Sequence, residues 1–302
     1  MSDRIPLRLY VLLALISVFW GLNWPVLKIV LAEMAPLHFR AWCLGGGAAG
    51  LALLALAKRQ SLAVPGGAWP ILIGASLCNV GVWNVCIAFG APLLESGRAA
   101  ILAFTFPVWG VIVGAMIGNE RLTRRSVIGV VLGAAAMLIL IGSDIAALGR
   151  SPVGAMLMLG AALGWALGTV LMKRWPVRMP MLSYTAWQLF IPAVPVILLA
   201  AFAEEGSFNP FSLSLPPLLG VAYNVLLCFI FCYWAWMTVA TALPVAVSSL
   251  GTLFVPVLGM VSGALVLGER PHASDYVALV LVMGSLAAVL LPPGVFSRRI
   301  AG

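Results

Sequence analysis

Charged residues are scarce in this 302-residue sequence: they make up 9% of its positions, whereas 63% are hydrophobic. No polar stretch is long enough to form a soluble domain, so the composition excludes a soluble globular protein. Apolar runs recur from one end to the other, which indicates a polytopic membrane protein embedded in a lipid bilayer. The first apolar run follows Met1-Ser-Asp-Arg without a cleavage site, so we expect it to remain as a membrane anchor.

The sequence also lacks the groups that several enzyme classes require. It has no glycine-rich nucleotide loop, which argues against an ATP-driven pump. Its two histidines lie near predicted span ends, so an intramembrane hydrolase would have no deep base beside its nucleophile. The five cysteines lie in apolar segments without metal-type spacing, and we expect no metal and no cofactor. The sequence therefore predicts a protein that is not an enzyme.

The apolar runs divide into ten predicted transmembrane helices joined by short connections. The predicted spans are 8–31, 36–57, 69–91, 94–117, 125–146, 152–173, 180–203, 216–241, 244–267 and 273–292. Short connections make neighbouring spans antiparallel, so we expect a compact all-α bundle.

The basic residues are distributed unevenly between the two ends of these spans. If the N-terminus is cytoplasmic, 12 of the 17 lysines and arginines lie on the cytoplasmic side and 5 on the far side. The positive-inside rule then places both termini in the cytoplasm. Because the basic residues lie in pairs between apolar runs, the net charge of +8 does not indicate nucleic-acid binding.

An internal repeat relates the two halves of the chain. Small residues, a proline, two glycines and a Glu-Arg pair in the segment from Ala99 to Arg121 recur 149 positions later, in the segment from Ser248 to Arg270. A second echo, from Trp20 to Trp165, has an offset of 145. Since each repeat would hold five spans, residues 1–148 and 149–302 are predicted to have opposite topology. Inverted repeats are a recurrent plan of secondary transporters.

The repeated segment carries small residues and a proline on one helix face. Gly110 and Gly114, like Gly259 and Gly263, have the spacing that allows close helix packing in a membrane. The prolines of the two segments, Pro107 and Pro256, remove a backbone hydrogen bond and favour a kink at which helices rock. A packing face and a gating kink are compatible, and both readings stay open.

These motifs resemble those of the drug/metabolite transporter superfamily, in its EamA-like branch. The resemblance rests on Trp20-Gly-Leu-Asn-Trp-Pro25 and on the Pro-x-x-Gly to Gly-Glu-Arg run from Pro256 to Arg270, with a less strict copy from Pro107 to Arg121. It covers nearly the whole chain and extends to the amino-acid exporters of that branch. It implies ten helices in two inverted five-helix repeats around a central cavity. The first copy has Asn119 where the second has Gly268, so the Gly-Glu-Arg motif is intact only once.

Two asparagines are candidates for the centre of such a cavity. Asn79 in the third span and Asn224 in the eighth span are 145 positions apart, as the repeat predicts for matched points. An amide in hydrocarbon needs partners and should face the bundle interior. The alternative is an interhelical hydrogen bond that only holds helices together.

Deep tryptophans accompany these amides. Packing is the simpler role for any one of them, but as a set beside Asn and Thr they suit a cavity for a small amphipathic solute. The predicted substrate-binding set is Trp20, Asn23, Trp24, Asn79, Trp83, Thr105, Trp109, Trp165, Thr169, Asn224, Phe231 and Thr252.

Basic residues at span ends are candidates for the two mouths of the path. Lys28 and Lys173 end their spans on opposite sides, and Arg98 opens the fourth span. Each could attract a carboxylate, although such lysines more often extend to lipid headgroups. With Pro107 and Pro256 they form the predicted mouth and gating set.

Together these features predict an exporter in the bacterial inner membrane. Its expected substrates are amino acids, including aromatic and other small apolar ones, carried by alternating access by a monomer or weak oligomer. All nine acids lie at span ends or in loops, whereas proton-driven carriers usually hold an ionisable group inside the membrane. Gradient-driven transport is therefore expected. The alternatives are an exporter of drugs or other metabolites, a proton-coupled antiporter, and a selective channel, which single-channel recording would distinguish.

Overall fold

The computed structural model describes residues 6–117, 122–146, 152–242 and 245–290, with the side chains of 144–146, 237, 240–242, 245–253 and 290 left out. Within these ranges every regular element is helical. Eight helical spans are long and apolar enough to cross a membrane, and two further apolar segments, Phe254–Leu267 and Ala273–Val289, are shorter. The ten predicted spans agree with these helices to within two residues at every described boundary.

The first five spans run up and down through the bundle. They are α1 (Leu7–Leu31), α2 (Pro36–Ala57), a third span made of α3 (Trp69–Ser76), η1 (Leu77–Val82), α4 (Trp83–Gly90) and η2 (Ala91–Leu93), a fourth made of α5 (Ser96–Ala103) and α6 (Phe106–Ile117), and α7 (Arg124–Ala146).

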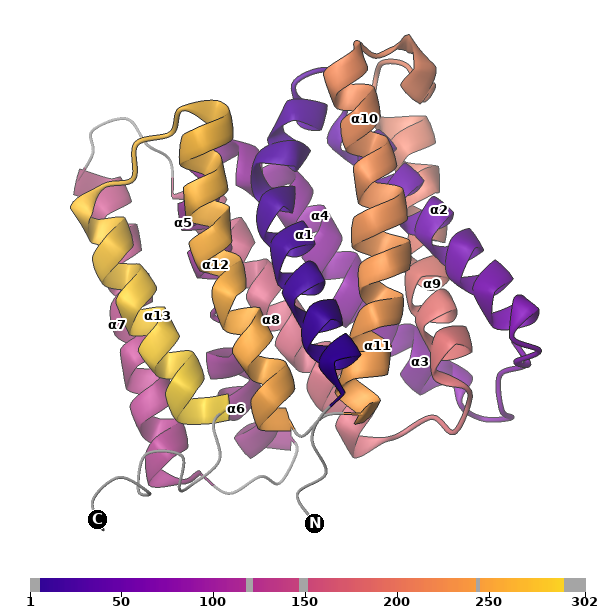
Figure 1. The fold of residues 1–302 in the computed structure, drawn as a ribbon, viewed down its shortest axis with the longest axis horizontal. Helices are drawn as coiled ribbons and strands as arrows, with labels where there is room; N and C mark the ends of the chain where they lie inside the picture. The colour runs from indigo at the N-terminus through magenta and orange to yellow at the C-terminus, as the bar shows by residue number, and fades with distance from the viewer. Residues whose placement is uncertain (1–5, 118–121, 147–151, 243–244, 291–302) are drawn as a thin grey trace.

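The second five follow the same order. They are α8 (Val153–Arg174), α9 (Met181–Ala203), an eighth span made of α10 (Leu215–Tyr223), η4 (Asn224–Phe231) and α11 (Cys232–Ala242), then α12 (Val245–Leu267) and α13 (Ala273–Leu290). A short helix, η3 (Pro210–Ser212), precedes α10. The start of α1 and the end of α13 lie at the same end of the bundle (Figure 1).

The third and eighth spans are each interrupted by π-helix. Asn79 lies within η1 and Asn224 begins η4, so both predicted amides fall in these segments. A π-helix displaces the backbone ladder by one residue, and such bulges are frequent at functional sites. Hydropathy alone does not reveal them.

The fourth span is broken rather than kinked at its proline. α5 ends at Ala103 and α6 begins at Phe106, with a turn between them. Pro107 is therefore the second residue of α6, where its missing N–H costs no intrahelical bond. By contrast, Pro256 lies inside the continuous helix α12. The expectation of matched mid-helix prolines thus holds only for Pro256.

Helix packing follows a matched pattern across the two halves. α2 packs along α9, and α7 packs along α13, at opposite edges of the bundle (Figure 1). Between them α1 packs on α12, while α8 packs on α5 and α6. α8 also contacts the third span, and α1 contacts the eighth. The α1–α12 contact thus corresponds to that of α8 with α5 and α6, while the α2–α9 and α7–α13 pairs each join spans that are five apart.

Glycines on α12 provide the close packing that their spacing predicts. A Cβ at Gly259 would lie 2.9 Å from Trp24 and 3.0 Å from Ala100. A Cβ at Gly263 would clash with the Glu269 carboxylate and lie 2.8 Å from the Ser96 side chain. Gly110 differs from its echo Gly259, because no neighbour lies within 4 Å of its Cβ position. The close-packing interpretation is therefore wrong at Gly110.

Large apolar side chains cover the outside of the bundle. Phe202, Leu265 and Met116 are among the most exposed of them. A soluble domain would not expose so many, whereas lipid tails solvate them. The fold is thus that of a multi-pass membrane protein.

Candidate functional site

Asn79 joins the third span to α8. Its side-chain amide donates to the Trp165 carbonyl oxygen at 2.9 Å and to Thr169 Oγ1 at 3.2 Å. Gly168 allows this approach, since a Cβ there would lie 2.5 Å from Asn79 Cβ. Three members of the predicted set are therefore in direct contact. Asn79 also makes an interhelical hydrogen bond, which is what we expected if it only holds helices together.

Aromatic rings gather beside this contact. The Trp83 and Trp165 rings are 4.8 Å apart, and the Phe106 ring lies 5.9 Å from Trp165 and 6.4 Å from Trp83. These three rings come from three different spans and are only partly buried. Phe106 was not in the predicted set; its place directly before Pro107 gave no sign that the helix would begin there and turn its ring inward. The cluster provides an apolar surface next to the amide.

Asn224 is less well satisfied than Asn79. It is fully buried, and its Nδ2 donates to the Gly220 carbonyl in its own span at 3.1 Å. Its Oδ1 is buried without a hydrogen-bond partner. Nearby, Trp20 Nε1 donates to the Cys228 carbonyl at 3.3 Å, and the Trp20 ring lies 6.1 Å from Tyr233. The two matched amides therefore have different surroundings.

The remaining predicted residues occupy several kinds of position. Asn23 Oδ1 and Trp109 Nε1 are buried without a hydrogen-bond partner. Trp24 is only 5% exposed and packs against Gly259 in the α1–α12 contact. Thr105 is buried and donates to the Leu102 carbonyl at 2.6 Å.

One of the predicted residues, Phe231, lies away from this centre. Phe231 lines an outer groove of about 300 Å³ together with Leu54, Lys58, Ile230 and Trp234. The side chain of Thr252 lies outside the described part of the chain. A second groove, of about 440 Å³, opens between α3 and α9 and is lined by apolar side chains.

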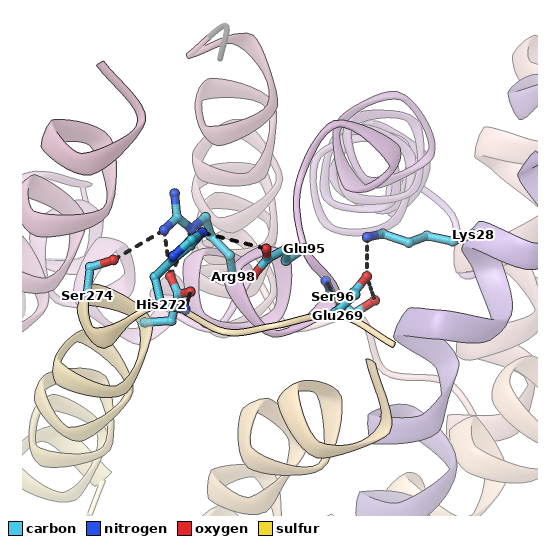
Figure 2. Close-up of polar contacts among 8 residues, drawn as sticks. Lys28, Glu95, Ser96, Arg98, Glu269, His272 and Ser274 are labelled. Atoms are coloured by element: carbon cyan, nitrogen blue, oxygen red, sulfur yellow. Dashed lines mark hydrogen bonds and ion pairs between the residues drawn. The ribbon is translucent and has the colours of Figure 1, made fainter. Parts of the chain in front are cut away.

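Lys28 is part of an ion pair at the end of the bundle where α1 finishes (Figure 2). Its Nζ lies 2.6 Å from Glu269 Oε1, and the two side chains are 17% and 12% exposed. Glu269 also accepts from the Ser96 backbone N–H at 2.7 Å and from Ser96 Oγ at 2.9 Å. This group, Lys28, Ser96 and Glu269, is called the Lys28 clamp below. It ties α1 and the start of α5 to the loop after α12.

Arg98 forms a second contact beside it. Arg98 donates to Asp275 Oδ1 through Nε at 2.9 Å and through Nη2 at 2.7 Å, and both side chains are 2% exposed. Ser274 Oγ lies 3.3 Å from the same Nη2, and Asp275 also accepts from the His272 backbone N–H at 2.7 Å. His272 Nε2 lies 3.9 Å from Glu95 Oε1. Both contacts join residues of the first half to residues of the second (Figure 2).

The sequence did not reveal these partnerships. Glu269 and Asp275 lie at span ends, as expected, but Glu269 is partly buried and Asp275 is buried there, and both bond to residues more than 170 positions away. Lys173, the echo of Lys28, is exposed at the end of α8. Glu120, the echo of Glu269, lies outside the described residues. The only signal in the sequence was the Glu-Arg pair that closes each copy of the repeat.

No group of three or more metal-ligating side chains is assembled within the described ranges. The arrangement instead consists of amides and rings in contact within the bundle, and of polar contacts between the halves at one end.

Comparison with known proteins identifies the family of the chain. The model of the EamA-like transporter family matches twice, over residues 8–142 and 152–291. An uncharacterized transporter of Bacillus subtilis, YoaV, is 24% identical over 296 residues, which is 96% of this chain and 98% of that protein. A probable amino-acid metabolite efflux pump of Escherichia coli is 27% identical over 289 residues, covering 91% and 92%. A solved crystal structure shares the fold, with a TM-score of 0.66 at 21% identity over 96% of this chain and 99% of that chain. The chain belongs to the EamA-like transporter family.

Proposed function

We propose that this protein exports amino acids, including aromatic and other small apolar ones, across the bacterial inner membrane. The two halves, residues 1–148 and 149–302, act as inverted five-helix repeats with both termini in the cytoplasm. They rock about the region of Asn79 and Trp165, so that the path opens to one side at a time.

The observation that carries this proposal is the matched packing of the two halves, with polar contacts between them at one end. Rocking requires an interface that can open without unfolding either half. The Lys28 clamp and the Arg98–Asp275 pair both connect residues of different halves. In this proposal they close the path at the end where α1 finishes. The exposed Lys173 at the opposite end is consistent with a path that is open at that end.

The substrate class is supported by two separate features. The rings of Trp83, Phe106 and Trp165 suit an apolar side chain, and Asn79 provides a polar group beside them. Relatives in two enterobacteria are named as probable amino-acid metabolite efflux pumps. An exporter of drugs or other metabolites is the second candidate, because the same rings suit any flat apolar solute.

Efflux from liposomes tests the proposal. The purified protein is reconstituted into vesicles loaded with labelled leucine or phenylalanine, with and without an imposed pH gradient. We expect efflux down the amino-acid gradient that does not depend on the pH gradient. Efflux only with a pH gradient would contradict the uncoupled mechanism and point to the partly buried Glu269 or the buried Asp275 as a proton carrier. No efflux of any amino acid would contradict the substrate class.

A further inference from the structure

Arg40 is a buried charge that the sites described above do not use. It lies in the second turn of α2, is 2% exposed, and is among the largest fully buried side chains of the described residues. Its Nε is buried without a hydrogen-bond partner. The sequence carried a signal for it, because an arginine lies four residues inside the predicted span 36–57.

No described carboxylate neutralises this guanidinium. Within the described side chains, Glu269 pairs with Lys28 and Asp275 with Arg98. Other acids are engaged elsewhere: Glu33 accepts from Ser214, Glu95 lies near His272, and Glu204 accepts from the Leu37 and His38 backbone N–H groups. Glu205 is exposed.

The polar groups that act on the Arg40 charge are Cys43, which shares a hydrogen bond with it, Cys228 and Tyr233. The guanidinium carbon also lies 5.0 Å from the centre of the Phe39 ring. Thiols and phenols are neutral near pH 7, and a thiol is a weak hydrogen-bond acceptor. An isolated buried charge is strongly unfavourable unless it is paired and hydrogen-bonded. The position is therefore one where an anion from outside the chain would be strongly favoured.

The surroundings indicate which anion would fit. Cys228 and Tyr233 also contact Trp20, through the hydrogen bond to the Cys228 carbonyl and through the ring pair at 6.1 Å. Asn224, whose Oδ1 has no partner, lies four residues before Cys228 in the π-helix η4. A guanidinium without a described acidic partner, an amide oxygen without a hydrogen-bond partner and a partly buried indole thus lie around the same segment of the eighth span. These are the groups that a carboxylate, an ammonium and an apolar side chain require.

We propose that Arg40 binds the carboxylate of the transported solute, with Asn224 Oδ1 accepting a hydrogen bond from its ammonium group. The proposal rests on the function proposed above and adds the group that selects amino acids over uncharged apolar solutes. Because Arg40 is closed off in this structure, the solute reaches it when the halves rock. The test therefore measures binding to the whole purified protein, which samples its own conformations.

The experiment compares R40M, R40K and R178M with the wild-type chain. Arg178 is exposed between α8 and α9, so R178M removes the same charge without touching the site. The melting temperature is followed by tryptophan fluorescence while L-phenylalanine, its methyl ester, acetate or inorganic phosphate is added. We expect phenylalanine, but not the ester, to raise the melting temperature of the wild type and of R178M. R40M should need at least about a tenfold higher concentration for the same shift, and R40K an intermediate one.

The ligand-free melting temperature separates this role from a structural one. Arg40 has no described acidic partner to lose, only its contact with the Phe39 ring and its hydrogen bond with Cys43, so R40M should melt close to the wild-type temperature. A lower melting temperature in R40M, together with an unchanged response to phenylalanine, would overturn the proposal. So would equal responses to phenylalanine and its ester in the wild type.

Acetate and phosphate distinguish a wrong site from a wrong substrate. A shift with acetate that R40M loses, without a response to any amino acid, would keep Arg40 as a carboxylate site and contradict the proposed substrate. A shift with phosphate alone would overturn the carboxylate assignment. Efflux of amino acids by R40M at the wild-type rate would overturn the Arg40 proposal and leave the export function standing.

Discussion

Two buried arginines, Arg98 and Arg40, differ in whether a described acid neutralises their charge. Arg98 and Arg40 are each 2% exposed, and each lies near the start of a helix. Arg98 is held by Asp275, with Ser274 beside it, whereas the Arg40 Nε has no partner and no described acid acts on its charge. The surroundings of Arg98 are those of a structural contact between the halves. The surroundings of Arg40 are those of a ligand-binding site. The same side chain at the same burial thus supports opposite roles.

Removing the partner of Arg98 should have the largest effect. D275A leaves a buried guanidinium uncompensated, and breaking such a pair typically costs about 3–5 kcal/mol of stability. We expect a clear fall in the melting temperature, measured in detergent. The double variant R98M/D275A should recover much of the loss, because the unpaired charge is gone. A D275A protein as stable as the wild type would show that the two arginines do not differ as described.

Weakening the Lys28 clamp should have a smaller effect, on conformation more than on stability. E269Q removes the charge that faces Lys28, and a partly exposed pair contributes on the order of 1 kcal/mol. That energy corresponds to a population shift of about fivefold toward the state open at this end. The readout is labelling of a cysteine introduced at Ser262, which is 4% exposed and bonded to the Gly21 carbonyl.

The control for this labelling is the same Ser262→Cys protein with Glu269 intact, and the unmodified chain reports on the native cysteines. We expect the labelling rate by a membrane-impermeant maleimide to rise by about fivefold in E269Q. An unchanged rate would argue that the clamp does not hold this end closed.

The two matched asparagines allow the same comparison, between a side chain with partners and one without, for two neutral groups. N79L removes hydrogen bonds to Trp165 and Thr169 and should cost about 1 kcal/mol of stability. N224L removes an amide whose oxygen is unpaired, so its stability should change less. Transport should fall in both variants. Equal stability losses, measured by melting temperature, would contradict the distinction.

The smallest effect concerns an exposed contact outside the membrane-spanning segments. Hydrogen bonds from Ser214 Oγ and the Ser214 backbone N–H lower the pKa of the Glu33 carboxyl below its ordinary value. A lowered pKa means that this contact stabilises the fold above the ordinary range and is lost as the pH falls through the lowered value. Hydrogen exchange of the Ser214 amide should therefore accelerate on acidification. E33Q should abolish that pH dependence, and a dependence that persists in E33Q would have another cause.

The sequence predicted the spans well because hydropathy and length set them. The break between Ala103 and Phe106 and the π-helices at Asn79 and Asn224 were not predictable, since they change the backbone ladder without changing the apolar pattern. The repeat predicted close helix packing at both Gly110 and Gly259. Only Gly259 packs closely against another helix, because a close approach depends on the partner helix as well.

The candidate site was predicted less completely than the fold. Asn79, Trp165 and Thr169 do meet, as their places on helix faces suggested. The roles of Lys28 and Arg98 were less evident, because their partners Glu269 and Asp275 lie in the other half of the chain. In the sequence, Arg40 was only one of the five basic residues expected on the far side, since a sequence does not show which charge lacks an acidic partner.

Efflux by R40M tests the central claim most directly, because it requires both a working exporter and a carboxylate site. Wild-type, R178M and R40M proteins are reconstituted in vesicles loaded with labelled phenylalanine, without a pH gradient, at equal protein levels. We predict equal efflux by the wild type and R178M, and at least about a tenfold lower rate for R40M at low internal phenylalanine. Efflux by R40M at the wild-type rate would contradict the account of Arg40, and no efflux by the wild type would contradict amino-acid export itself.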